Sequence, residues 1–223
     1  MTLQFDPSRE EFEKFLELQL GLVGISLAQI SAEVAIVYPI LERQFKRTKN
    51  KYFTRDGLAI LRVAHNAQYT IFLYHLSRAL FLQNRRSEAD RVYALLRMAS
   101  GIDLYYEVVL PEWWTCDHPL GSVIGRGQFE PKASFVFTQN CNIGNNNGIY
   151  PKIAGNLIMF PNSSLLGDTR MSGNVILANG AYVIDAGELN DCIVYGRCPD
   201  LTIKRLSRER FYKLSPLAHS AVG

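Results

Sequence analysis

Apolar residues recur at every sixth position along the second half of the chain. The clearest run has nine consecutive members: Ile153, Met159, Leu165, Met171, Leu177, Val183, Leu189, Tyr195 and Leu201. Upstream, Phe129, Phe135 and Cys141 keep the same register, and Asn147 breaks it. Small or β-branched residues precede this column by two positions, at Ser163, Thr169, Val175, Ala181 and Gly187.

A period of six matches neither the 3.6-residue repeat of a helix nor the two-residue alternation of a flat strand. It is typical of a solenoid, in which one short strand and its turn form a unit that stacks on its neighbours. We therefore predict a parallel β-helix whose lumen holds the large residues and whose bends hold the small ones.

The first hundred residues carry a helical pattern instead. Ser8, followed by acidic residues such as Glu11, predicts the start of a first helix. Residues 58–83 are predicted as a long apolar helix, and residues 87–100 as a last helix that ends at Gly101. These signals predict a helical domain that precedes the repeats.

Two histidines, His65 and His75, fall within the predicted helix over residues 58–83. We expect both to be packed or hydrogen-bonded residues, because no carboxylate or cysteine lies three or four positions away. The predicted organisation is a helical domain over residues 1–101, a β-helix over 102–205 and a basic tail over 206–223.

The window of residues 20–41 contains a single charged residue, Glu33, and raises the question of a membrane helix. A charge in the middle of a bilayer is costly. We therefore favour a core or subunit-interface helix over a membrane span.

Other apolar residues are assigned to surfaces of the β-helix. Trp113 and Trp114 precede the repeats and are expected to cap the open end of the lumen. Ile158, Ile176 and Val194 lie outside the main column, and we expect them to pack around a threefold axis in an assembly of three chains.

Composition narrows the class of protein further. A net charge of +3 over 223 residues argues against a dedicated nucleic-acid binder. The four cysteines show no Cys-x-x-Cys spacing, so we expect neither a zinc site nor a disulfide framework. Together with the lack of a secretory signal pattern at the N-terminus, this predicts a reduced, cytoplasmic setting and no metal.

Short motifs follow one another in the order in which they occur in serine O-acetyltransferases. Gly-Ile-Asp at 101–103 resembles that family's Gly-Val-Asp, and Asp-His at 117–118 followed by Val-Ile-Gly at 123–125 matches it without a gap. Thr-Gln-Asn at 138–140 and Pro-Lys-Ile at 151–153 resemble the next strand and turn. Over roughly residues 65–205 the chain therefore resembles this family of acetyl-CoA-dependent acyltransferases. The resemblance implies an α+β fold in which helices precede a left-handed parallel β-helix of hexapeptide repeats.

The candidate catalytic residues are His118 and Asp103. Acylation of a hydroxyl by a thioester needs a base, and a histidine oriented by a carboxylate supplies one near neutral pH. The family's orienting Asp stands fourteen residues before the Asp of its Asp-His pair, and Asp103 stands fourteen before Asp117. The alternative is that His118 is a structural histidine at a domain junction.

The acceptor site departs from the family. The family carries Arg-His before Pro-Lys-Ile to help hold serine, whereas this chain has Ile149 and Tyr150. Without that Arg, the carboxylate of serine lacks its bidentate partner. Asp117, Gln139 and Tyr150 are the candidate acceptor-binding residues, and neutral hydrogen bonds favour a sugar or nucleotide-sugar hydroxyl over serine.

The resemblance also implies a cofactor site and an assembly. The pantetheine arm of acetyl-CoA would lie in a groove between neighbouring β-helices, which requires a homotrimer or a dimer of trimers. The implied contacts are Gly144, Phe160, Pro161, Ala178 and Asn179, with Lys204 or Arg205 at the 3′-phosphate. A merely solvated basic tail is the alternative for the last two. True serine acetylation and a catalytically silent trimeric scaffold are the rival functions.

Overall fold

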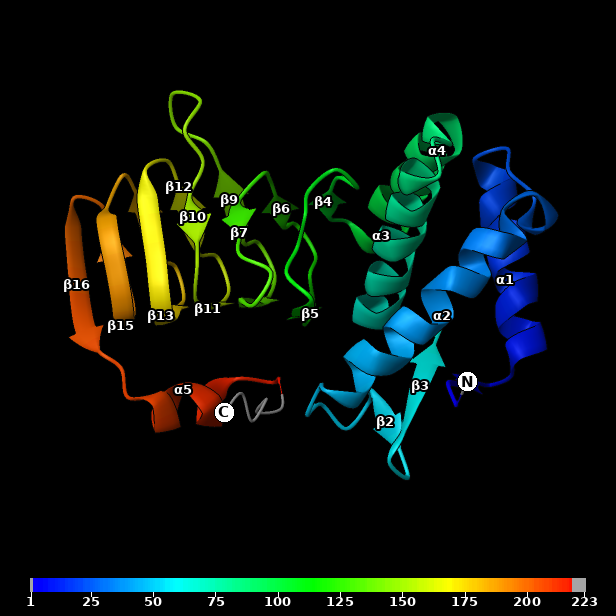
Figure 1. Cartoon of the computed structure of the whole chain (residues 1–223), viewed down its shortest axis with the longest axis horizontal. Coiled ribbons are helices and arrows are strands. Elements are labelled where there is room, and N and C mark those ends of the chain that lie inside the picture. The colour runs from blue at the N-terminus through cyan, green and yellow to red at the C-terminus, as the bar shows by residue number, and fades with distance from the viewer. Residues whose placement is uncertain (1, 218–223) are drawn as a thin grey trace. The chain divides into compact units, whose positions relative to one another are not determined.

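The structure is a computed structural model that describes residues 2–217. The chain forms two compact units, which divide between Glu107 and Val108 (Figure 1). The sequence places this boundary after residue 101. Residues 102–107 join the helices because they bond to them: the Tyr106 hydroxyl donates to Asp90 Oδ1 at 2.5 Å, and Arg78 Nη1 donates to the Tyr106 carbonyl at 2.9 Å.

Helices make up most of the first unit. They are α1 (Arg9–Leu22), the 3-10 turn η1 (Leu27–Ile30), α2 (Ser31–Lys46), α3 (Asn66–Leu82) and α4 (Arg86–Ser100). The Ser8 hydroxyl accepts the backbone N–H of Glu11 at 3.2 Å and so caps α1. Gly101, with a φ of 63°, ends α4. Both helix ends lie where the sequence predicts them.

The apolar window at residues 20–41 is divided between two helices. α1 ends at Leu22, and the chain turns at Gly24, whose φ is 70°. Glu33 is buried, and one of its carboxylate oxygens lies 3.1 Å from Nη1 of Arg85. Within residues 2–217, no single helix has the length and apolar character to cross a membrane, although α1 and η1–α2 together, bent by 100°, meet that test by length and composition.

The predicted helix over residues 58–83 is wrong in its first part. Residues 58–62 form β3 (Leu58–Arg62), which pairs in parallel with β1 (Gln4–Asp6) and antiparallel with β2 (Thr54–Arg55). Asp56 and Gly57 have positive φ values of 52° and 77°, which suits a tight hairpin turn. The apolar run that suggested a helix is instead a short buried strand.

The two histidines of this region differ in role. His65 precedes α3 and caps it, since its Nδ1 accepts the backbone N–H of Gln68 at 3.4 Å. His75 lies within α3, where its Nε2 is 2.8 Å from Oε1 of Gln44. Burial lowers the pKa of His75 to about 3, helped by the nearby Arg78 and Arg43 charges. His75 is therefore a neutral, hydrogen-bonded core residue, as expected.

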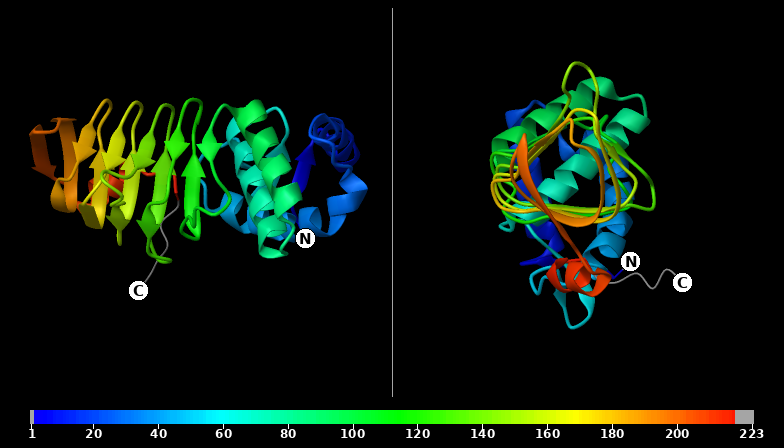
Figure 2. Two further views of the ribbon diagram at one scale, coloured as in Figure 1. Left: turned by 90° about the horizontal axis from the view of Figure 1, so that it is seen from above. Right: turned by 90° about the vertical axis from the view of Figure 1, so that its left-hand side faces the viewer.

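The second unit is a parallel β-helix with three faces, seen end-on in Figure 2. The first face contains β5 (Trp113–Cys116), β8 (Ser134–Phe137), β11 (Asn156–Met159) and the later parts of β13 (Thr169–Leu177) and β15 (Gly187–Arg197). The second face contains β6 (Val123–Ile124), β9 (Asn142–Gly144), β12 (Ser164–Leu166) and β14 (Tyr182–Ile184). The third contains β7 (Gln128–Phe129), β10 (Lys152–Ile153) and the early parts of β13 and β15.

The predicted lumen column is confirmed over most of its length. Its seven members from Ile153 to Leu189 are each at most 2% exposed. In the second column, Ser163, Thr169, Val175 and Ala181 are fully buried. Asn147, which breaks the register, lies in a loop over residues 145–150 that leaves the coil between β9 and β10. The six-residue period therefore reports inward-facing positions of stacked coils.

The last two members of the column are not in the lumen. Met171 pairs with Leu189, eighteen residues on, but after a bulge at 172–175 Val175 pairs with Cys192, seventeen residues on. β15 thus has one residue fewer than β13 at the bulge. Because side chains alternate along a strand, the residues of β15 after this point face the opposite side from the one that the six-residue period predicts. Val194 is fully buried in the lumen, and Tyr195 packs outside. Leu201 lies in β16 (Asp200–Arg205), which is antiparallel to β15.

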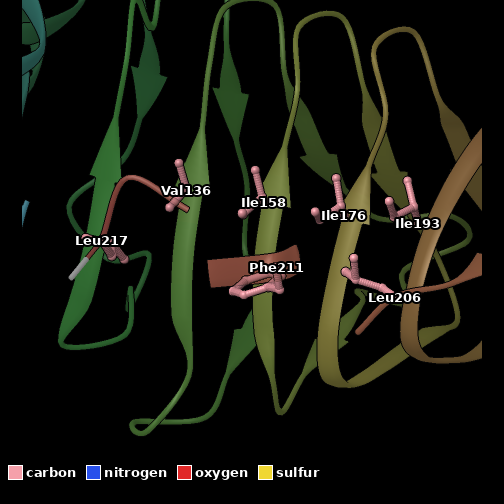
Figure 3. Packing of buried hydrophobic residues seen from close by; sticks show 7 residues of the cluster. All are labelled: Val136, Ile158, Ile176, Ile193, Leu206, Phe211 and Leu217. Atoms are coloured by element: carbon pink, nitrogen blue, oxygen red, sulfur yellow. The ribbon is translucent and has the colours of Figure 1, made fainter. Parts of the chain in front are cut away.

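The outer side of the first face is covered by the C-terminal segment of the same chain. Val136, Ile158, Ile176 and Ile193 form an apolar column there, packed by Leu206, Phe211 and Leu217 (Figure 3). Phe211 belongs to α5 (Arg208–Leu214). The expectation that Ile158, Ile176 and Val194 pack around a threefold axis is therefore wrong: the first two lie beneath α5, and Val194 faces the lumen. The described part of the predicted basic tail is an amphipathic cover.

The two tryptophans lie at the start of the β-helix. Trp114 is 1% exposed and stacks on Phe137, with ring centroids 6.3 Å apart, so it fills the first coil of the lumen. Trp113 faces outward and packs against the column beneath α5. Only one of the pair therefore serves the lumen.

Candidate active site

His118 lies on the turn that leads from β5 on the first face to β6 on the second. Its φ is 48°, an uncommon left-handed conformation for a residue with a side chain, and its imidazole is 81% exposed. Nε2 is 3.7 Å from Oδ1 of the half-exposed Asp117. The imidazole is therefore open to a substrate and is not packed as a structural group.

Backbone bonds hold this turn against the next coil. The N–H of Asp117 donates to the Phe137 carbonyl at 3.0 Å, and the N–H of Asn140 donates to the Leu120 carbonyl at 2.9 Å. Gly121, with a φ of 72°, lies so close to Asn140 that a Cβ at position 121 would clash with the Asn140 side-chain oxygen. A rigid turn thus presents a freely accessible imidazole, as a positioned base requires.

The turns of successive coils stack below His118 along one edge of the prism. This edge, here called the His118 edge, consists of the segments that join the first face to the second: 117–122, 138–141, 160–163 and 178–181. It brings together seven of the predicted site residues: Asp117, His118, Gln139, Phe160, Pro161, Ala178 and Asn179.

A ladder of asparagine amides runs along the His118 edge and was not predicted. Asn140 Nδ2 donates to Asn162 Oδ1 at 3.0 Å, and Asn162 Nδ2 donates to Asn179 Oδ1 at 3.4 Å. Asn140 and Asn162 have φ values of 54° and 62°, a conformation that Asn tolerates better than most residues. The recurrence of Asn or Gly at this corner, continued by Gly180, is the sequence signal that could have revealed the ladder.

Other predicted residues lie elsewhere on the β-helix. Gly144 is the last residue of β9 on the second face. Tyr150 belongs to the next edge, which joins the second face to the third, and its hydroxyl accepts from Asn145 Nδ2 at 3.3 Å. Ile149 beside it is 49% exposed. Lys204 and Arg205 lie exposed in β16, and Lys204 Nζ is 5.6 Å from the centre of the Tyr195 ring. One β-helix therefore does not bring Tyr150 to His118.

Asp103 belongs to the first unit, in β4 (Asp103–Leu104). The Tyr93 hydroxyl, from α4, donates to its Oδ1 at 2.5 Å. Burial and, next, the bond to Asp103 together raise the pKa of Tyr93 to about 12, so the phenol stays protonated as a donor at neutral pH. Tyr93 was not singled out from the sequence, because no local motif links position 93 to position 103 across a helix end.

Comparison with known proteins identifies solved structures that share the fold of this chain. No protein-family model matches the sequence, and no curated protein matches it either. Among solved structures, serine acetyltransferase from Brucella abortus superposes with a TM-score of 0.67 at 18% identity, over 90% of this chain and 85% of that one. The coenzyme A complex of that protein superposes with a TM-score of 0.66 at 17% identity, covering 90% and 84%.

A serine complex gives a similar result. Serine acetyltransferase from Neisseria gonorrhoeae with serine superposes with a TM-score of 0.60 at 19% identity, over 83% of this chain and 80% of that one. The chain therefore has the fold of the serine acetyltransferases, with helices followed by a parallel β-solenoid, as the sequence predicts.

Proposed function

We propose that this chain is an acetyl-CoA-dependent O-acetyltransferase in which His118 is the general base. The observation that carries the proposal is the exposed imidazole of His118 on a rigid turn, at the head of a row of residues, in a fold shared with serine acetyltransferases. A protein with this fold is solved with coenzyme A bound.

The reaction follows from the position of His118. The imidazole removes the proton of the acceptor hydroxyl while the hydroxyl oxygen attacks the thioester carbonyl. The carbon–sulfur bond then breaks, the coenzyme A sulfur leaves, and the imidazolium returns the proton to it. Asp103, assigned by its spacing from Asp117, would orient the imidazole and stabilise its charged form.

The coenzyme A arm is assigned to the His118 edge. Phe160, Pro161, Ala178 and Asn179 follow His118 down successive coils of this edge. Phe160 and Ala178 also pack against the column beneath α5, which makes the wall of the proposed groove rigid. Arg205 or Lys204 would meet the 3′-phosphate, for which exposed cations are suited.

The complete site would form between copies of the chain. Gly144, on the second face, and Tyr150, on the next edge, both lie off the His118 edge, so one β-helix cannot supply all the proposed contacts at one place. In a side-by-side assembly of three β-helices, the loop over residues 145–150 of one copy would meet the His118 edge of the next. This supports the expected homotrimer or dimer of trimers.

The acceptor is proposed to be a sugar or nucleotide-sugar hydroxyl rather than serine. Near Tyr150 the loop offers neutral groups, the Tyr150 hydroxyl and the Asn145 amide, and the half-exposed apolar Ile149. An unpaired carboxylate in a partly dry groove costs several kcal/mol, whereas one neutral hydrogen bond returns only about 1 kcal/mol.

Release of free thiol from acetyl-CoA across a panel of sugars, nucleotide sugars and serine tests the proposal. We expect His118→Ala to lower turnover by about two to four orders of magnitude, which is the typical contribution of a general base, and Asp103→Asn to have a smaller but severe effect. His65→Asn, which retains a helix-capping side chain, is the control and should keep wild-type turnover. Unchanged turnover in both active-site variants would overturn the proposal and favour the catalytically silent scaffold instead.

The same assay tests the acceptor. Replacing Ile149 by Arg together with Tyr150 by His should raise the use of serine and lower the use of the native acceptor, because the guanidinium can pair with the serine carboxylate. Wild-type protein that acetylates serine at low KM and ignores sugars would establish the rival assignment, a true serine O-acetyltransferase.

A further inference from the structure

The β-helix ends at a strand whose outer edge pairs with no other strand in the described part of the chain. β16 is joined to β15 by six antiparallel residue pairs, from Cys192 opposite Arg205 to Arg197 opposite Asp200. The sheet order places no strand beyond it among residues 2–217. The backbone N–H and C=O groups of such an edge can pair with a further strand.

Apolar surface accompanies this edge. Ile203 in β16 is 53% exposed. It lines a shallow hollow of about 640 Å³, whose other lining residues are Leu201, Ile184, Ala186, Pro199, Cys198 and the charged Asp185. The end of a solenoid normally carries a polar cap, so an open hollow with three branched aliphatic side chains indicates a contact surface.

We infer that two copies of the chain join end to end by pairing their β16 strands antiparallel, about a twofold axis beside Thr202. In this register Thr202 lies opposite Thr202 of the second copy. Leu201 lies opposite Ile203 of the second copy, and Asp200 lies opposite its Lys204. By symmetry, the Leu201–Ile203 pair and the Asp200–Lys204 pair each occur twice in the dimer. Every position from 200 to 204 therefore has a complementary partner.

The side-chain directions agree with this register. Leu201 and Ile203 alternate with Asp200, Thr202 and Lys204 along the strand, so the aliphatic pairs lie on one side of the joined sheet and the polar pairs on the other. The aliphatic side is the side of the hollow. Each copy would thus help to close the open hollow of the other.

Neighbouring registers lack this complementarity. A shift of one residue places Leu201 opposite Lys204 and Thr202 opposite Ile203, which removes the aliphatic pairs. A charged residue on an edge strand ordinarily repels unrelated strands. Here Lys204 disfavours most partners but matches Asp200 of a second copy, and this self-complementarity is why we assign the edge to an identical chain. The pairing uses neither His118 nor Asp103; of the two residues proposed for the 3′-phosphate it uses Lys204 and leaves Arg205.

Molecular mass in solution tests the inference. One chain has a mass of 25.2 kDa. For a single chain, or for a trimer whose three β16 strands lie at one end, pairing through β16 doubles the mass. Asp200→Lys places two like charges in contact twice, so we expect the dissociation constant of this contact to rise about tenfold or more and the mass at micromolar concentration to halve in sedimentation velocity.

A charge swap and a cross-link distinguish loss of the β16 contact from misfolding of the Asp200→Lys variant. Asp200→Lys combined with Lys204→Asp should restore the wild-type mass. Thr202→Cys should form an intermolecular disulfide, because directly opposite Cα atoms lie about 4.5–5.5 Å apart. Asp200→Cys is the control, since two copies of position 200 lie four residues apart along the joined strands. A mass that Asp200→Lys leaves unchanged, or equal cross-linking of the two cysteine variants and wild type, would overturn the inference.

Discussion

At the scale of single residues, accessibility and rigidity separate candidate chemistry from packing. His75 is a buried, neutral histidine bonded to Gln44, and His65 caps a helix. His118 alone among the described histidines has an open imidazole on a turn held by backbone bonds. A base needs its ring free for the substrate and its backbone fixed, and His118 meets both conditions.

Tyr93 is expected to act on the reaction as a positioning residue through Asp103. Its hydroxyl donates to Oδ1 of Asp103, and loss of a hydrogen bond to a charged group typically costs about 1.5–3 kcal/mol. We expect Tyr93→Phe to lower kcat about tenfold or more, by that energy scale, while KM for acetyl-CoA stays unchanged. The measurement is steady-state thiol release at saturating acceptor.

Tyr105→Phe is the matched control for this prediction. The Tyr105 hydroxyl donates to the Tyr106 hydroxyl at 2.8 Å, and its ring packs on that of Tyr93. The two variants should lose similar stability, but only Tyr93→Phe should lose turnover. Equal kcat values in both would assign Tyr93 a purely structural role.

At the scale of elements, α5 determines which surface of the β-helix is available. It buries the outer column of the first face with Phe211, which is 1% exposed. A sequence signal exists, since Phe211 and Tyr212 interrupt a basic run. That signal does not show which surface the aromatic residues cover, because the column beneath them comes from four distant strands.

We expect Phe211→Ala to destabilise the β-helix. Truncation of a buried phenylalanine costs about 3–5 kcal/mol, and it would also expose Ile158 and Ile176. Thermal unfolding followed by circular dichroism should show a lowered transition for the β-helix. Arg210→Ala, at an exposed position of the same helix, is the control and should leave it unchanged. Equal midpoints for the two variants would mean that α5 adds nothing to stability.

At the scale of the whole molecule, the candidate site is divided over two edges of the prism. His118 heads one edge, and Tyr150 lies on another. A single β-helix therefore carries the proposed acceptor contact, Tyr150, and the proposed base, His118, on different edges. Under the proposed function, catalysis depends on assembly.

Mixing two defective variants tests this dependence. His118→Ala chains lack the base, and Tyr150→Ala chains lack an acceptor contact. When the two are unfolded and refolded together, some sites receive His118 from one chain and Tyr150 from another. The mixture should then exceed the average activity of the two separate preparations. Activity equal to that average would show that each chain works alone.

The sequence by itself determined the features that depend on neighbouring residues. The six-residue column placed Ile153 to Leu189 in the lumen, because each coil repeats the same local geometry. Ser8 and Gly101 marked helix ends, because caps act within one turn. The Asp-His pair at 117–118 was singled out by its resemblance to a family motif, and it lies on an exposed turn.

Only the tertiary structure decided the features that depend on distant contacts. A single bulge in β13 turned Tyr195 out of the lumen, and periodicity cannot register the loss of one residue in a pairing. β1 drew residues 58–62 into a sheet against their helical pattern. The winding of the coils placed Gln139 below His118 and Tyr150 on another edge. Position on the prism depends on which residues form strands and which form turns, and the pairing between neighbouring coils decides that.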